Sequence, residues 1–248
     1  MSELFTTADY PQVAIVVPVR NEADNVGPLA DEISSALSGR WTFELIYVDD
    51  ASTDGTEAAL AALKGERPFL RQIKHAASCG QSAAVRSGVR AARAPVVVTL
   101  DGDGQNDPSF IPAMLGVLEQ GGAAMGLVAA QRVGRRSGAF KRFQSRIANG
   151  VREAILRDGT RDTGCGLKAF RRDAYLALPY FDGLHRFLPA LFRRDGFAVG
   201  YVDVIDRPRR AGVSKYGMWD RLWVGIADLF GVRWLIRRRK RVPQVSEV

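Results

Sequence analysis

The sequence is poor in the residues that build disulfide frameworks and histidine metal sites. It has two cysteines, Cys79 and Cys165, and two histidines, His75 and His185, among 248 residues. Two cysteines give no disulfide framework, which favours a reducing compartment. Two histidines exclude a metal centre built from several histidines. A metal site in this chain has to draw on other side chains.

Long apolar runs and glycine-rich phosphate loops are also missing. No stretch reaches about 18 uninterrupted apolar residues, so we predict no transmembrane helix. Residues 1–11 have neither a basic start nor an apolar run, so we expect no signal peptide. No G-x-G-x-x-G or Walker sequence occurs, which argues against a dinucleotide-binding or P-loop enzyme.

The composition is that of a basic globular protein. Hydrophobic residues make up 46% of the chain, which is normal for a protein with a buried core. The formal net charge of +8 suggests anionic partners, namely nucleotides, phospholipids or nucleic acid. The length allows one large α/β domain or two small ones.

The first hundred residues alternate between short apolar runs and helical patterns. We predict strands over 13–17, 43–48, 70–74 and 96–100, and helices over 26–37, 56–64 and 83–92. Pro18 is expected to end the first strand. Val96–Leu100 is apolar or β-branched without alternation, which indicates a strand buried on both faces. This order predicts an α/β fold with a doubly wound, mostly parallel sheet and helices on both faces.

The second half has a different character. We predict a helix over 110–118, a strand over 124–130, a basic helical stretch over 132–157, a loop or short strand over 162–170, a helix over 187–193, a strand over 198–204, a loop over 207–217 and a helix over 219–236. The basic stretch is either a solvated face or a track for anionic phosphates. We expect a catalytic domain over 1–217, followed by an amphipathic basic helix over 218–248.

Polar clusters follow three of the predicted strands, and one contains two aspartates separated by a glycine. Asp101 and Asp103 point to the same side if the chain stays extended there. Ligands of open α/β sheets bind beyond the carboxyl ends of the strands. Two carboxylates at that edge indicate a site for a divalent cation that carries substrate phosphates. An EF-hand is excluded because its sixth and twelfth positions are Asn106 and Pro112.

The chain resembles the family 2 glycosyltransferases with a GT-A fold, and most closely the polyprenyl-phosphate (dolichol-phosphate) mannosyltransferases. The resemblance covers about residues 13–217. Its motifs are P-V-R-N-E, V-D-D-A-S-T-D-G-T, G-Q-S-A-A-V-R-S-G, D-G-D-G-Q-N-D-P, D-T-G-C-G-L-K-A-F, H-R-F-L-P-A-L and R-A-G-V-S-K-Y-G. Each motif is modest alone, but their order and spacing are specific.

The resemblance implies a role for each matching position. Residues that bind the nucleotide sugar would be Pro18, Arg20, Glu22, Val48, Asp50, Asp101 and Gly102. Ligands for Mg²⁺ or Mn²⁺ would be Asp101, Asp103 and Gln105. Catalytic residues would be Asp103, Arg132, Arg209 and Lys215, and contacts to the acceptor phosphate would come from Arg136, Arg186, Arg209 and Lys215. Position 20 is often aromatic in the family, so the role of Arg20 stays open.

The implied reaction is inverting, metal-dependent transfer of a hexose to a polyprenyl phosphate, with dolichyl or undecaprenyl chains as acceptors. Mannose from GDP-mannose is favoured, and glucose, N-acetylglucosamine or an amino sugar from a UDP donor is the alternative. A bound cation and nearby arginine or lysine would stabilise charge on the leaving phosphate. A phosphate monoester is largely a dianion at neutral pH, so it can attack without a protein base.

The basic tail suggests where this reaction takes place. Trp219, Trp223 and Trp234 and the run Arg237–Arg241 favour an interfacial helix on anionic lipid. We therefore expect a peripheral protein at the cytoplasmic face of the cytoplasmic membrane, with a membrane-protein partner or a homo-oligomer left open. Nucleic-acid binding is the remote alternative, because stacking aromatics are not interleaved with the basic clusters.

Overall fold

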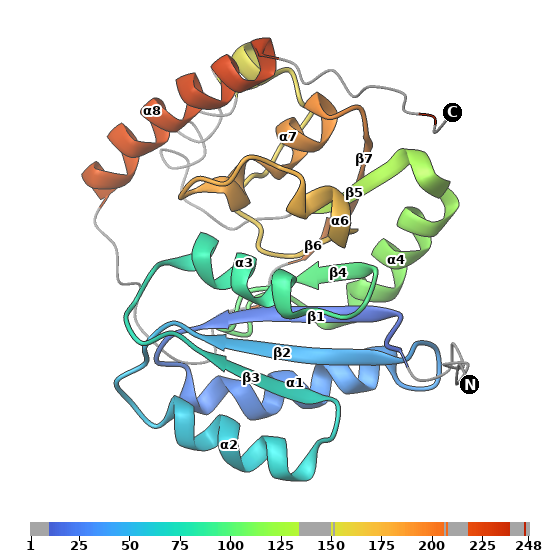
Figure 1. Cartoon of the computed structure of the whole chain (residues 1–248), viewed down its shortest axis with the longest axis vertical. Helices are drawn as coiled ribbons and strands as arrows, with labels where there is room; N and C mark the ends of the chain where they lie inside the picture. The colour runs from blue at the N-terminus through green and yellow to red at the C-terminus, as the bar shows by residue number, and fades with distance from the viewer. Residues whose placement is uncertain are drawn as a thin grey trace.

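Seven strands form one sheet in the computed structural model, which describes residues 10–133, 150, 152–205, 207, 218–238 and 246 (Figure 1). They are β1 (Val13–Val19), β2 (Phe43–Asp49), β3 (Leu70–Lys74), β4 (Val96–Thr99), β5 (Met125–Arg132), β6 (Lys168–Arg171) and β7 (Ala198–Val204). Their order is β3-β2-β1-β4-β6-β5-β7. All pairs are parallel except those of β6, which is antiparallel to β4 and β5. The predicted α/β fold with a mostly parallel sheet is confirmed.

Helices cover both faces of this sheet (Figure 1). They are α1 (Ala23–Leu37), α2 (Thr56–Glu66), α3 (Gln81–Ala91), α4 (Ile111–Gln120), α6 (Arg172–Leu176), α7 (Leu188–Arg194) and α8 (Met218–Arg237), and residues 152–156 are also helical. The helices α1, α2 and α4 pack on one face, and α3, α6 and α7 pack on the other. A short 3-10 helix, η1 (Pro108–Phe110), precedes α4.

The alternating side chains of β1 explain why its sequence has no polar face. Val13, Ile15 and Val17 belong to the core under α1 and α4, whereas Ala14 and Val16 belong to the core under α3 and α7. All five are at most 2% exposed. A strand with a hydrophobic core on each side has to be apolar throughout.

Pro18 does not end the first strand, contrary to the prediction. β1 continues to Val19, and Pro18 lies opposite Val48 of β2. Val16 accepts a hydrogen bond from the Leu100 backbone N–H, so Val16 and, two residues on, Pro18 have their backbone groups on the β4 side. Because β4 ends at Thr99, the missing N–H of Pro18 removes no bond of the ladder.

β6 is a short strand in the middle of the sheet. It pairs Val97 of β4 with Phe170, and Leu127 of β5 with the same residue. Phe170 is fully buried and stacks on Tyr175 with ring centroids 4.9 Å apart. The insertion brings the segment that precedes Lys168 next to the carboxyl end of β4.

The C-terminal helix α8 packs on the same face as α7. Val232 is 1% exposed, and Leu229, Leu235 and Ile236 contact the same core. Arg194 of α7 donates to the Leu235 carbonyl at 2.9 Å. Across the described part of the chain, no helix, α8 included, has the length and apolar content needed to span a bilayer. The division into a domain over 1–217 and a tail over 218–248 stays a prediction.

Candidate nucleotide-sugar site

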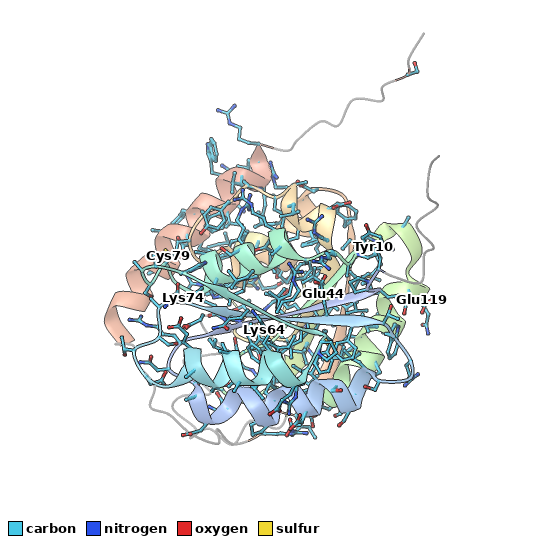
Figure 2. The ribbon with its side chains drawn as sticks, turned by 60° about the horizontal axis from the view of Figure 1, so that its bottom comes forward. Tyr10, Glu44, Lys64, Lys74, Cys79 and Glu119 are labelled. Atoms are coloured by element: carbon cyan, nitrogen blue, oxygen red, sulfur yellow. The ribbon has the colours of Figure 1, made fainter. Side chains whose placement is uncertain are left out.

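The predicted polar clusters lie along one edge of the sheet. Val19 of β1 pairs with Asp49 of β2, and Val16 pairs with Thr99 of β4, so β1, β2 and β4 end side by side. Figure 2 shows Lys74 and Cys79, at and after the end of β3, on one side of the molecule, and Tyr10 on the other. This carboxyl edge is where ligands bind in open α/β sheets.

The chain turns sharply after β4 instead of staying extended, which corrects the geometry expected for Asp101 and Asp103. The Asp101 N–H donates to the Asn106 side-chain oxygen at 3.0 Å, and the Gln105 N–H donates to Asp103 Oδ1 at 3.1 Å. Gly104 has φ +74°, a conformation that glycine adopts without strain. The charge of Asp103 still raises the pKa of Asp101, so after the turn the two carboxylates are near enough to repel each other.

Gly102 packs against β1 and leaves no room for a side chain. A Cβ at this position would lie 2.6 Å from Val19 Cγ1 and 3.0 Å from the Pro18 carbonyl oxygen. The close approach that Gly102 allows is therefore to the end of β1. Its predicted contact with a nucleotide sugar stays a prediction.

The Asp101 carboxyl group is surrounded by residues from two other parts of the chain. Gln81, the first residue of α3, donates its amide to Asp101 Oδ1 at 2.8 Å. A Cβ on Gly166 would lie 2.4 Å from the Asp101 carboxyl carbon, so only glycine leaves room for it. The buried Lys168 donates to the Cys165 carbonyl oxygen and adds positive charge nearby. The hydrogen bond from Gln81 and the close packing of Gly166 fix where the carboxylate lies.

The charge on this carboxylate is poorly compensated by the protein. Burial and the charge of Asp103 raise the pKa of Asp101 to about 6, despite the opposing effects of Lys168 and Arg132. A divalent cation between the two carboxylates would offset this repulsion. Carboxylate and amide oxygens are also the ligands that Mg²⁺ takes. The residues present therefore fit the predicted cation.

Asp50, after β2, is held very differently. Its Oδ1 accepts hydrogen bonds from His75 Nδ1 and the Cys79 N–H, each at 2.8 Å. Its Oδ2 accepts from the Ser78 hydroxyl at 2.7 Å and the Gly80 N–H at 2.9 Å. Burial raises the pKa of Asp50, but these bonds outweigh burial and leave the pKa below its ordinary value. Asp50 thus anchors the loop that leads into α3.

A group of three potential metal ligands surrounds this aspartate. Asp50, His75 and Cys79 are the one group of His, Cys, Asp or Glu side chains in the described ranges whose ligand atoms all lie within 4.8 Å. His75 Nε2 is also hydrogen-bonded to Ser87 Oγ at 2.9 Å. With both histidine nitrogens and both carboxylate oxygens engaged, this group is a hydrogen-bond network.

The loops after β1 and β2 lock together. Asn21 and Ala51 both have positive φ, 57° and 58°. The Asn21 N–H donates to Ser52 Oγ at 2.9 Å, and the Thr53 N–H donates back to Asn21 Oδ1 at 2.7 Å. Left-handed backbone outside glycine persists only where neighbours fix it, and it often marks functional sites. These loops carry the predicted nucleotide-binding residues Arg20, Glu22 and Asp50.

A small cavity lies beside Asp101. It is lined by Pro18, Gln81, Val85, Thr99, Leu100, Asp101, Gly166, Lys168, His185 and Leu188. His185 Nδ1 lies 2.7 Å from Ser82 Oγ. Burial, with the charges of Lys168 and Arg186, lowers the pKa of His185 to about 3, so the ring is neutral at physiological pH. The His185 ring therefore adds no positive charge to the cavity beside Asp101.

Two predicted phosphate-binding arginines are paired with acids. Arg132, the last residue of β5, donates from Nη2 to Asp162 Oδ1 at 2.9 Å. Burial raises the pKa of Asp162, but the bonds and charge of Arg132 outweigh it and lower the pKa. Arg186 donates to Asp228 of α8 at 2.6 Å and lies over the Phe187 ring. An anion at either arginine would compete with these carboxylates.

The structure brings together only part of the predicted set. Pro18 and Asp101 line the same cavity, and Val48 is fully buried in β2. Arg136, Arg209 and Lys215 lie outside the described residues, and so does most of the basic stretch 132–157. The roles predicted for all these residues stay predictions.

Sequence reasoning missed the residues that surround Asp101. Gln81, Gly166 and Lys168 lie in two of the motifs that carry the family resemblance, but no role was assigned to them. Only the family resemblance could have pointed to these residues, because none of them is near Asp101 in sequence.

The family model for "Glycosyl transferase family 2" matches residues 14–178. This chain belongs to glycosyltransferase family 2. It is therefore a glycosyltransferase, and the matched range contains β2 to β6 and all of β1 except Val13.

The most similar proteins found include two kinds of bacterial transferase. The chain is 34% identical over 237 residues to a dodecaprenyl-phosphate galacturonate synthase of Rhizobium johnstonii, covering 93% of this chain and 69% of that protein. It is 30% identical over 209 residues to an undecaprenyl-phosphate 4-deoxy-4-formamido-L-arabinose transferase of Yersinia pestis, covering 84% and 63%. The chain thus spans about two thirds of the length of these relatives.

Solved structures show the same fold. A glucosyl-3-phosphoglycerate synthase from Mycobacterium tuberculosis, in complex with Mn²⁺, UDP and phosphoglyceric acid, has a TM-score of 0.68 at 23% identity and covers 91% of this chain and 78% of that one. A mannosyltransferase from Pyrobaculum calidifontis, in complex with GDP-Man and Mn²⁺, has a TM-score of 0.66 at 22% identity and covers 95% and 66%. At these identities the likeness establishes the GT-A architecture alone.

Proposed function

We propose that this protein transfers a sugar from a nucleotide sugar to a polyprenyl phosphate, with Mg²⁺ or Mn²⁺ bound at the end of β4. The observation that carries the proposal is the pair of aspartates, Asp101 and Asp103, in one turn at the carboxyl end of β4 in a family 2 glycosyltransferase. Both relatives described above are named for polyprenyl-phosphate acceptors, which supports the same acceptor here.

Each part of the site has a task in this proposal. Asp101, Asp103 and Gln105 would hold the cation, which when bound offsets charge on the leaving diphosphate. Gln81 and Gly166 keep the Asp101 carboxylate in place. Arg132, at the end of β5, would face the phosphates after exchanging its bond to Asp162. The acceptor phosphate is largely a dianion and needs no protein base.

The choice of donor sugar follows from the relatives. The sequence resemblance favours GDP-mannose, with UDP sugars as the alternative. The names of the relatives, a galacturonate synthase and a formamido-arabinose transferase, favour modified sugars instead. We therefore place the uronic acid and amino-sugar donors ahead of GDP-mannose.

A donor panel tests the proposal. The protein is incubated with undecaprenyl phosphate, Mn²⁺ and each nucleotide sugar in turn, and the lipid is analysed by mass spectrometry. We expect one donor to add one sugar residue, with no product when the cation is removed by EDTA. The Asp101→Ala, Asp103→Ala double variant is the control. No sugar on lipid from any donor would contradict the proposed reaction.

We further propose that α8 binds the surface of the membrane that contains the acceptor, on its cytoplasmic face. Ile226, Phe230 and Trp234 are 38%, 61% and 58% exposed and recur every fourth residue, so they share one face. Arg238 lies over the Trp234 ring, and exposed Arg237 precedes it. Apolar side chains flanked by arginines suit an anionic lipid surface.

Vesicle flotation tests this second proposal. Phe230→Glu with Trp234→Glu should release the protein from vesicles that contain anionic phospholipid. Tyr10→Glu is the control, because Tyr10 is 54% exposed and lies away from α8 (Figure 2). Equal binding of the double variant and the wild type would rule out this face of α8.

A further inference from the structure

Arg207 joins the turn after β4 to two other parts of the chain. Its backbone N–H donates to the Gln105 carbonyl oxygen at 3.0 Å. Its guanidinium lies 2.6 Å from Asp107 Oδ2 and 2.8 Å from Glu32 Oε2 of α1. The residue follows β7 and precedes the segment that contains Arg209, so it links the predicted metal turn to the predicted phosphate-binding loop.

Different bonds hold the start of this turn and its far end, near Asp107. Its start is fixed by the bonds of Asp101 to Asn106 and of Gln105 to Asp103. Beyond Gln105, Asp107 accepts the Ser109 N–H at 2.9 Å and so caps η1. Arg207 contacts this end through its backbone bond to Gln105 and its ion pair with Asp107. The direction of the Gln105 side chain depends on where its backbone is held.

An arginine suits this position better than a lysine. The planar guanidinium has several N–H donors in a fixed arrangement, so it can pair with two carboxylates at once. The ammonium group of lysine is a point charge without such an arrangement. The Arg207 side chain is 35% exposed, so its ion pairs contribute more to geometry than to stability.

We propose that Arg207 is a positioning residue for the cation site: it holds Gln105 and Asp107 so that the oxygen ligands of the turn stay together. This inference rests on the proposed metal-dependent function. Residues that orient metal ligands without touching the metal typically change metal affinity about 10-fold to 100-fold when replaced. Arg207 holds the turn through the Gln105 backbone and the Asp107 side chain, whereas Gln81 bonds directly to the Asp101 carboxylate.

The chain offers a matched control in Arg67, which pairs with the residue of α1 that precedes Glu32. Arg67 lies 2.8 Å from Asp31 and 2.9 Å from Glu66, so it also bridges two acids, one of them adjacent to Glu32. Arg67 has no contact with the turn after β4 among the bonds that the described residues make. Replacing it removes a similar pair of ion pairs away from the candidate site.

The test measures Mn²⁺ binding to the purified full chain by electron paramagnetic resonance, without sugar nucleotide. We expect Arg207→Gln to weaken Mn²⁺ binding about 10-fold and Arg67→Gln to leave it within about twofold. Asp107→Asn should weaken binding too, and the double variant should be about as weak as Arg207→Gln alone, because both act through one contact. Should Arg207→Gln fold poorly, Arg207→Lys keeps the charge without the fork and should bind Mn²⁺ less tightly than wild type.

Each result has a distinct meaning. Normal Mn²⁺ affinity in Arg207→Gln, with a melting temperature lowered as in Arg67→Gln, would show a purely structural role and overturn the inference. Wild-type protein that binds no Mn²⁺ would overturn both this inference and the proposed cation site. Binding that is lost in the Asp101→Ala, Asp103→Ala variant but kept in Arg207→Gln would refute only the role of Arg207.

Discussion

Asp50 after β2 and Asp101 after β4 stand at the same edge of the same sheet, yet the protein treats them in opposite ways. Asp50 takes hydrogen bonds from four donors on the loop after β3, and its pKa is lowered. Among the described residues, Asp101 receives one side-chain bond, from Gln81, and it lies beside the like charge of Asp103; its pKa is raised to about 6.

We interpret the difference as one between an aspartate that anchors a loop and a candidate metal ligand, and the nucleotide-binding role predicted for Asp50 stays a prediction. A carboxylate whose lone pairs are already used stabilises the fold and has little left to offer a cation. A buried carboxylate beside a second one is destabilised by its own charge, so a bound cation lowers its energy. The same residue type at equivalent strand ends therefore indicates opposite roles once its donors are counted.

Removing the acid pair should have the largest effect on metal binding and activity. Replacing Asp101 and Asp103 with alanine should abolish Mn²⁺ binding and slow sugar transfer by about 10³-fold, because charge on the leaving group loses its counter-ion. The fold should persist, since no strand pairing is removed. Initial rates and Mn²⁺ binding measure the effect, and a rate within tenfold of wild type would exclude the site.

Removing Asp50 should act on stability instead. Asp50→Ala leaves its four donors without their acceptor, so we expect the free energy of unfolding to fall by about 2–4 kcal/mol. Mn²⁺ affinity should be unchanged. Urea titration measures the loss, and Asp54→Ala, which removes a more exposed acceptor for Thr56, is the control. Lost Mn²⁺ binding in Asp50→Ala would mean that the two aspartates are not separate in role.

Crowding the Asp101 carboxylate should weaken metal binding without unfolding the protein. In Gly166→Ala the new methyl would lie 2.4 Å from the Asp101 carboxyl carbon, so the carboxylate has to move. We expect Mn²⁺ affinity to fall about 10-fold with little change in unfolding free energy. Gly65→Ala is the control, because its new methyl meets no atom within 4 Å. Unchanged affinity in Gly166→Ala would show that the carboxylate position is not critical.

Replacing His185 should have the smallest effect, a change in how stability depends on pH. Its pKa in the folded protein is about 3, against about 6.5 in the unfolded chain. Between these values the unfolded chain binds a proton that the folded protein excludes, so stability falls as the pH is lowered. From pH 7 to pH 5.5, wild type should lose about 1 kcal/mol more than His185→Gln, measured by urea unfolding. Parallel pH profiles would contradict a neutral, buried ring.

The first four strands could be predicted because each is a compact apolar run. The run Val96–Leu100 identifies a strand between two cores. Pro18 led to a wrong end for the first strand, because the N–H that proline lacks would face β4, which has already ended at that level. β6 could not be predicted with the same certainty. Four residues, Lys168–Arg171, are too few for a periodic pattern, and their place between β4 and β5 is decided by packing of Phe170.

The candidate site was predictable as a cluster but not as a set of interactions. Strand topology alone brings Asp50 and Asp101 to one edge. Their environments depend on Ser78 and Gly80 in one case and on Gln81 and Gly166 in the other. Such contacts are set by loop conformation and by the close packing of a backbone against a side chain, and a single sequence has no pattern for either.

The insertion of β6 also has a consequence for how the chain can fold during its synthesis. β4 can pair with β1 once residue 99 has left the ribosome, but its other edge has no partner until residues 168–171 have been made. During that interval the nascent chain exposes an unpaired strand of valines, which is a template for aggregation. We expect this edge to be a binding site for chaperones in the cell.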